Sequence, residues 1–150
     1  MKKKICLVGG CGFIGHNLAL ELKSAGHSVT VIDSLAINNI LTFTGDDIKN
    51  KNLYNSILNN RIDLLKKANV DLLIQDAREY HAMSRLIERI QPDIIIHLAA
   101  VSHANKSNKD PHTTFDHSLR TLENTLDLAR NNKAHFIYFS SSMVYGNFEK

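Results

Sequence analysis

Cysteine is scarce in this sequence, and its two copies lie close together. Cys6 and Cys11 are both near the N-terminus of the 150 residues, so they cannot form a disulfide framework. No set of four ligands has the spacing of a zinc site. This cysteine usage is typical of a protein in a reducing cytoplasm, where we expect this one to be found.

Long hydrophobic runs are also missing. No stretch approaches the roughly 20 apolar residues that a membrane helix requires. The apolar run Ile5–Val8 follows three lysines but ends at Gly9, which is too short for the core of a signal peptide. We therefore expect no membrane partner.

The charge pattern gives no sign of a nucleic-acid partner. The formal net charge is only +3 with His neutral, and the one tight basic run, Lys2–Lys4, is typical of a solvated terminus. No basic stripe is interleaved with aromatic residues. We therefore expect no nucleic acid to be bound.

Short apolar runs alternate with helical patterns along the chain, whose 43% hydrophobic and 22% charged residues are ordinary for one globular domain. The five apolar runs are Lys4–Val8, Val29–Ile32, Asp71–Ile74, Asp93–Leu98 and His135–Phe139. Helical spacing of apolar residues extends from Ile14 to Ala25, from Leu53 to Leu65, from Met83 to Ile90 and from Phe115 to Ala129. This alternation predicts a doubly wound parallel sheet with helices on both faces.

The ends of several elements are marked by residue type. Gly26 suits the C-terminal stop of the first helix, and Asp110 followed by Pro111 suits the start of the last one. A loop is expected early in the long connection from Leu35 to Asn69. Its loop residues are Asn38, Asn39, Thr44, Gly45 and Asp46.

A glycine-rich segment, residues 9–15, follows the first predicted strand and opens the first predicted helix. It contains G-x-G-x-x-G at Gly10, Gly12 and Gly15, and G-x-x-G-x-x-G from Gly9. Such glycines permit a tight turn and let the backbone approach a pyrophosphate, while the helix N-terminus offers N–H groups to the phosphates. The alternative is a glycine-rich turn without a ligand. Because a strand precedes and a helix follows, we favour a dinucleotide site.

Two aspartates follow predicted strands at positions suited to adenosine. Asp33 ends the second strand, where it can accept hydrogen bonds from ribose hydroxyls; the alternative is that it caps the next turn. A carboxylate there repels a 2′-phosphate and no arginine is nearby in sequence, so NAD is favoured over NADP. Asp76, after the third strand, can bond the adenine amino group or cap the following helix, and the sequence favours neither.

The fourth predicted strand ends in His97-Leu98-Ala99-Ala100. The small residues let the backbone lie against a cofactor, and His97 is expected to make a buried structural hydrogen bond. The histidines that could suggest a metal show no helical i, i+4 pair with a carboxylate base, so no metal is expected. They are His97, His103, His112 and His117.

Serines at positions 140–142 follow the fifth strand, at the end of the sheet where ligands bind in such folds. The alternative is a polar turn. No G-x-S-x-G surrounds them, so a serine hydrolase is not favoured.

Taken in order, these motifs resemble the extended short-chain dehydrogenase/reductase family, and within it the nucleotide-sugar epimerases. The motifs are residues 9–15, Asp33, Asp76, residues 97–100 and residues 141–146, Ser-Ser-Met-Val-Tyr-Gly. The resemblance implies a Rossmann-type, three-layer α/β/α domain over residues 1–150, with strand order 3-2-1-4-5 and later strands missing. It implies NAD bound by Gly9, Gly12, Phe13, Ile14, Gly15, Asp33, Asp76, Ala77, Leu98, Ala99 and Ala100.

The resemblance also implies an activity. It is epimerisation or reduction of a nucleotide sugar through hydride transfer to NAD and a keto-sugar intermediate, by an enzyme expected to be a homodimer at full length. Ser141 takes the place of the active-site Ser/Thr. The family's Tyr-x-x-x-Lys pair is expected beyond Ser141, and Tyr145 and Lys150 have the wrong spacing, so the substrate lobe and this pair are expected outside the chain, which by itself is expected to be inactive.

Two departures from the family pattern narrow this implication. Ser118 stands where the family often has Asn in the helix after the fourth strand. Ser142 and Met143 replace the Asp-Glu of the sugar 4,6-dehydratases, which disfavours that activity. The alternative function is a non-catalytic, NAD(H)-binding regulatory domain.

Overall fold

Five parallel strands form the centre of the computed structural model, which describes residues 1–36, 40–43, 49–101, 109–141 and 146. The strands are β1 (Lys4–Val8), β2 (Ser28–Asp33), β3 (Asp71–Ile74), β4 (Ile94–His97) and β5 (His135–Tyr138). Their order in the sheet is β3-β2-β1-β4-β5, as the sequence and its resemblance predicted. In this order β1 is central, and its register pairs Val8 with Ile32 of β2 and with His97 of β4.

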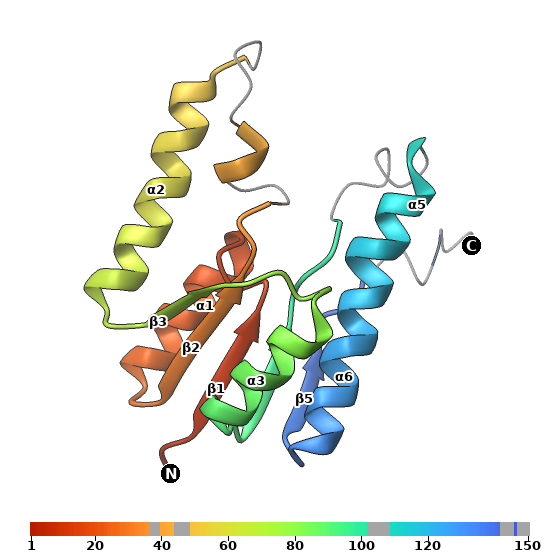
Figure 1. The fold of residues 1–150 in the computed structure, drawn as a ribbon. Helices are drawn as coiled ribbons and strands as arrows, with labels where there is room; N and C mark the ends of the chain where they lie inside the picture. The colour runs from red at the N-terminus through yellow and green to blue at the C-terminus, as the bar shows by residue number, and fades with distance from the viewer. Residues whose placement is uncertain (37–39, 44–48, 102–108, 142–145, 147–150) are drawn as a thin grey trace, which may run out of the picture.

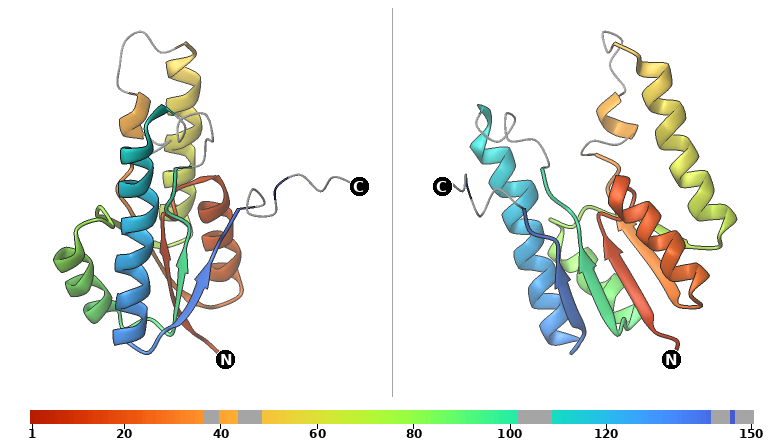
Figure 2. Two further views of the ribbon diagram at one scale, coloured as in Figure 1. Left: turned by 90° about the vertical axis from the view of Figure 1, so that its right-hand side faces the viewer. Right: turned by 180° about the vertical axis from the view of Figure 1, so that it is seen from behind.

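Helices cover both faces of the sheet (Figures 1 and 2). One face carries α1 (Phe13–Ser24) and α2 (Lys51–Lys67), and the other carries α3 (Tyr80–Ile90) and α6 (Thr121–Asn131). Short helical segments are η1 (Ile40–Phe43), α5 (Pro111–Thr114) and the π-helical turn η2 (Phe115–Arg120), and α5, η2 and α6 follow one another without a break.

The alternation of side chains along β1 divides the core into two layers. Ile5 and Leu7 point to the layer that also holds Leu65 of α2, whereas Cys6 and Val8 point to the layer that holds Met83 of α3. Both layers are fully closed over the central strands, which explains why these strands are apolar on both faces. The edge strands β3 and β5 are more open, and Ile74 and Tyr138 are 59% and 49% exposed.

The predicted helix ends are confirmed. Gly26 has a φ of +88°, and the N–H groups of Gly26 and His27 donate to carbonyls of the last turn of α1, which is the Schellman arrangement. Asp110 accepts a hydrogen bond from the Thr113 N–H at 3.0 Å, with Pro111 at the first helical position.

The connection from Leu35 to Asn69 is only partly described. Its predicted loop residues Asn38, Asn39, Thr44, Gly45 and Asp46 lie outside the described residues, and η1 occupies residues 40–43 between them. The predicted helix is present as α2, but only Leu58 and Leu65 of its apolar residues are buried. Within the described part of the chain, no helix has the length and apolar character to cross a bilayer.

Candidate functional site

A cavity of about 530 Å³ lies where the carboxyl ends of the strands meet. All eleven residues that the sequence and its resemblance proposed for cofactor binding line it. They are Gly9, Gly12, Phe13, Ile14, Gly15, Asp33, Asp76, Ala77, Leu98, Ala99 and Ala100. The remaining lining residues are Val8, Ile32, Ser34, Arg61, Gln75, His117, Thr121, Phe139 and Ser140. This is the edge at which doubly wound sheets bind ligands, because the strand order reverses between β1 and β4.

Two glycines of the loop between β1 and α1 are required by the packing of the protein itself. Gly9 has a φ of +81°, and a Cβ added there would lie 2.6 Å from the Ala99 nitrogen. A Cβ on Gly15 would lie 2.6 Å from Gly10 Cα, so this glycine lets α1 approach the loop. These two positions have no room for any side chain.

Gly12 differs from both. A Cβ added at Gly12 would meet no protein atom closer than Gly9 O at 3.6 Å, and the residue has an ordinary extended conformation, with φ −67° and ψ 177°. Neither packing nor backbone strain therefore requires glycine at this position, which lines the cavity. A cavity wall without a side chain fits a ligand whose bulky group approaches the backbone closely, as a pyrophosphate does.

The first turn of α1 opens onto the same cavity. No side chain caps it, and no acidic residue lies in its first turn. Phe13 and Ile14 line the cavity with 70% and 55% of their side chains exposed. An uncapped helix N-terminus suits a phosphate, and apolar side chains beside it suit the rest of a dinucleotide.

Asp33 connects β2 to the glycine loop. Its Oδ2 accepts a hydrogen bond from the Cys11 N–H at 2.8 Å, and its Oδ1 accepts one from the Leu35 N–H at 2.8 Å. Both interpretations of this residue thus find support, because it orders the next turn and also lines the cavity. Burial raises the pKa of the Asp33 carboxyl, and the two backbone hydrogen bonds act against that rise.

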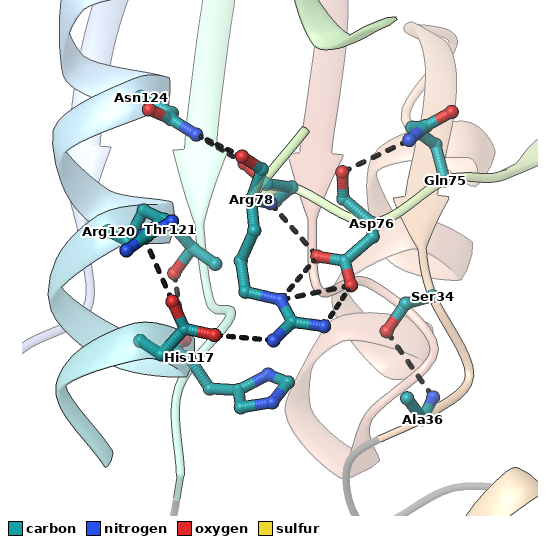
Figure 3. A network of polar contacts seen from close by, with 11 residues as sticks. Ser34, Ala36, Gln75, Asp76, Arg78, His117, Arg120, Thr121 and Asn124 are labelled. Atoms are coloured by element: carbon teal, nitrogen blue, oxygen red, sulfur yellow. Dashed lines mark hydrogen bonds and ion pairs between the residues drawn. The ribbon is translucent and has the colours of Figure 1, made fainter. Parts of the chain in front are cut away.

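Asp76 is held by Arg78 rather than by a helix (Figure 3). Its Oδ1 accepts the Arg78 N–H at 2.9 Å, and the Arg78 guanidinium donates to both carboxylate oxygens. Glu79 is the residue before α3, and the Asp76 side chain does not cap that helix. The capping alternative is therefore wrong, because the carboxylate turns back onto Arg78.

Arg78 also joins this loop to the helix on the other side of the cavity. Its guanidinium forms an ion pair with Asp116 of η2, which in turn pairs with Arg120 at 3.0 Å. Asn124 of α6 donates to the Ala77 and Arg78 carbonyls at 2.9 and 3.0 Å. Burial tends to raise the pKa of the Asp76 carboxyl, but the hydrogen bonds and charge of Arg78 outweigh burial, so this pKa is lowered. The hydrogen bond from Arg78 also lowers the pKa of Asp116.

Among the cavity residues that the sequence did not propose, two carry basic side chains. Arg61 reaches the cavity from α2, 28 positions after Asp33, and His117 reaches it from η2. Burial and the nearby Arg78 charge lower the pKa of the His117 imidazole. The sequence held a signal only for Arg61, since it lies three residues after Leu58 and four before Leu65 on the inner face of α2.

His97 is buried as expected, and of the expected hydrogen bond only a weak contact with the Ala99 backbone is present, which favours the charged ring less than burial opposes it. Neither ring nitrogen otherwise has a hydrogen-bond partner among the described residues, and the ring packs with centroids 6.3 and 6.1 Å from those of Phe136 and Tyr138. Burial lowers the pKa of the imidazole to about 4, so the neutral ring serves as part of the core.

The residues after β5 are only partly described. Ser140 lines the cavity, while Ser141 follows it as an exposed residue that does not line the cavity. Ser142, Met143 and Tyr145 lie outside the described residues, as does His103. Ser118 Oγ accepts the Val101 N–H at 3.1 Å and does not line the cavity, whereas its neighbour His117 does.

Comparison with known proteins shows the family to which the chain belongs. The model of the NAD dependent epimerase/dehydratase family matches residues 5–150. UDP-glucose 4-epimerase of Mycoplasma genitalium is 31% identical over 149 residues, covering 97% of this chain and 38% of that protein. UDP-N-acetyl-alpha-D-glucosaminuronate decarboxylase of Bacillus cytotoxicus is 30% identical over 153 residues, covering 97% of this chain and 39% of that protein.

The solved structures show the same fold. UDP-glucose-4-epimerase from Stenotrophomonas maltophila, determined with NAD and formylated UDP-arabinopyranose, superposes with a TM-score of 0.78 at 24% identity. That match covers 99% of this chain and 40% of the other. The chain thus spans about 40% of the length of the proteins it resembles.

Proposed function

Because the chain belongs to the NAD dependent epimerase/dehydratase family, we propose that it is the cofactor-binding part of an NAD-dependent enzyme that epimerises or reduces a nucleotide sugar. The observation that carries this proposal is the wall at Gly12, which has space for a side chain but presents bare backbone to the cavity. A dinucleotide supplies the reason for that bare wall, since its pyrophosphate requires close approach of the backbone.

The residues of the cavity fit the parts of NAD in order along its length. The uncapped first turn of α1 would receive the diphosphate, Asp33 the ribose hydroxyls of adenosine, and Asp76 with Ala77 the adenine. Leu98, Ala99 and Ala100 would lie against the other half of the cofactor. Bound NAD would supply the hydride acceptor and donor for oxidation of a sugar hydroxyl to a keto-sugar and its reversal.

The end of β5 would face the sugar. Ser140 lines the cavity and Ser141 follows it, so a hydroxyl here can hold the sugar hydroxyl that loses its proton. A serine hydroxyl has too high a pKa to act as the base itself without a partner that activates it. We assign Ser141 a role in positioning the substrate, with a separate residue serving as the base.

The outer face of the last helix supports the proposal of a homodimer. Phe115, Leu119 and Leu126 recur at helical spacing and are each at least half exposed. An apolar stripe of this kind is typical of a helix that packs against another protein surface. Sedimentation of the protein at several concentrations tests this part of the proposal.

Titration of both nicotinamide cofactors tests the proposed cofactor preference. Asp33 should favour NAD over NADP, because its carboxylate accepts from ribose hydroxyls and repels a 2′-phosphate. Calorimetry of the wild-type protein and of Asp33→Ala with NAD and NADP measures this preference. Wild-type protein that binds NADP as tightly as NAD would show that the role of Asp33 is wrong.

Substitution of Ser141 tests the catalytic part. In a protein of the relatives' full length that carries this segment, Ser141→Ala should lower kcat on the order of 10²-fold and spare NAD affinity. The assay is NAD-dependent conversion of a panel of UDP-, GDP- and dTDP-sugars, in which the 150-residue chain alone should be inactive. An unchanged kcat would leave residues 140–142 as a polar turn.

A further inference from the structure

Arg61 is a cation on the face of α2 that packs inward. Leu58 and Leu65, three residues before it and four after it, have only 4% and 0% of their surface exposed. Residues at this spacing lie on one side of a helix, and the inner side of a surface helix is normally apolar. A charge placed there needs a partner to offset the cost of removing it from water.

The described part of the protein supplies only a weak partner. The guanidinium carbon of Arg61 lies 5.8 Å from the centroid of the Phe13 ring, and no carboxylate among the described residues is within ion-pair distance of it. A cation above an aromatic face gains only a small stabilisation at a partly exposed site. The contact with Phe13 does not neutralise the Arg61 charge as a carboxylate would. The guanidinium therefore remains able to bind an anionic ligand in the cavity.

Arg78, beside the cavity residue Asp76, is an arginine whose charge is fully paired within the protein. Arg78 pairs with both Asp76 and Asp116, so its charge is balanced inside the protein. Arg61 lines the cavity directly and faces the ring of Phe13, the first residue of α1. The unbalanced cation therefore lies beside the helix N-terminus that the proposed function assigns to the diphosphate.

We propose that Arg61 binds a phosphate group of the bound dinucleotide, beside the N–H groups of the first turn of α1. This inference rests on the proposed function. A guanidinium donates two parallel hydrogen bonds to phosphate oxygens, and its planar fork can keep its contact with Phe13 while it does so. The phosphate is one of the bridging diphosphate, because Phe13 and Arg61 lie together at the N-terminus of α1.

A ligand series that varies the number of phosphates tests the assignment. Arg61→Gln should weaken ADP-ribose binding by about 10- to 100-fold, the range expected for a lost hydrogen bond to a charged group, and should leave adenosine binding unchanged. Arg61→Lys should give an intermediate loss, because it keeps the charge but not the fork. The matched control is Arg85→Gln, which removes the same charge from an exposed position of α3.

The outcomes separate this inference from the proposed function. A loss seen with both ADP-ribose and NAD assigns Arg61 to the diphosphate, and a loss confined to NADP overturns that assignment. Equal ADP-ribose affinity of Arg61→Gln and wild type overturns this inference alone. Failure of the wild-type protein to bind ADP-ribose overturns the proposed function and this inference with it. If Arg61→Gln unfolds, the Arg61→Lys protein with the same ligands decides the result.

Discussion

The two walls of the cavity are built by different forces. The glycine-loop wall depends on backbone contacts so close that a single methyl group on Gly9 would lie 2.6 Å from the Ala99 nitrogen. The wall formed by Asp76 depends on an ion-pair network through Arg78, whose side chain is 30% exposed. Packing contacts of the first kind tolerate little change, whereas partly exposed ion pairs contribute little to stability. Substitutions in the glycine loop should therefore destabilise the fold, whereas substitutions in the Asp76–Arg78 network should leave the protein folded.

The largest effect is expected within the glycine loop itself. Gly15→Ala places a methyl group 2.6 Å from Gly10 Cα and should lower the free energy of unfolding by about 3 kcal/mol or more. Gly12→Ala meets only Gly9 O at 3.6 Å, so its cost should stay below about 1 kcal/mol. Urea denaturation of both variants measures the difference. Equal losses of stability would show that the loop does not pack as described.

A comparable effect is expected in acid from His97, the buried residue that ends β4. Its pKa is lowered to about 4 by burial, so below the ordinary value near 6.5 the unfolded chain binds a proton that the folded chain rejects. Stability should therefore fall as the pH drops from 6.5 to 4, by about 3 kcal/mol for this group. The dependence should shrink in His97→Phe, which keeps a ring beside Phe136. Urea denaturation at a series of pH values checks this, and an unchanged slope in the variant would contradict it.

Smaller effects are expected at the Asp76 wall. Arg78→Gln should lower the melting temperature by only about 2–4 °C, as befits partly exposed ion pairs. The pKa values of Asp76 and Asp116 lie below their ordinary range, so their contribution is present at neutral pH and is lost as the pH falls below their unfolded values. Melting curves at pH 7 and pH 3 should therefore differ less for Arg78→Gln than for wild type.

The same substitution should affect recognition more than stability. If Asp76 bonds the adenine amino group, wild-type protein should prefer NAD over the deamino analogue, which lacks that group. Arg78→Gln should reduce this preference, because it frees the Asp76 side chain that Arg78 orients. Parallel calorimetric titrations of the two dinucleotides give the ratio. No preference in wild type would leave Asp76 with a structural role only.

Local patterns explain how much of the molecule the sequence could predict. Each strand and helix leaves its own signal in a few neighbouring residues, such as the apolar run Lys4–Val8 or the stop at Gly26, so element positions and sheet class could be predicted. The cavity residues could also be predicted where they lie at or just after the ends of strands, as Asp33 and Asp76 do.

Contacts between distant segments could not be predicted in this way. The pair Arg78 and Asp116 is 38 residues apart, and its formation depends on how α6 and η2 lie against the β3–α3 loop. Arg61 enters the cavity only because α2 packs against α1, which no local pattern specifies. The surroundings of the His97 ring have the same origin, since Phe136 and Tyr138 reach it only because β5 pairs with β4.

The central claim is that the bare wall at Gly12 exists to receive a dinucleotide. The most direct test is the NAD affinity of Gly12→Val, measured by calorimetry after circular dichroism has shown that the variant is folded. The account predicts that the wild-type protein binds NAD and that folded Gly12→Val loses at least about 100-fold in affinity, because the valine side chain occupies the place of the pyrophosphate. NAD binding of wild-type strength by the folded variant would contradict it.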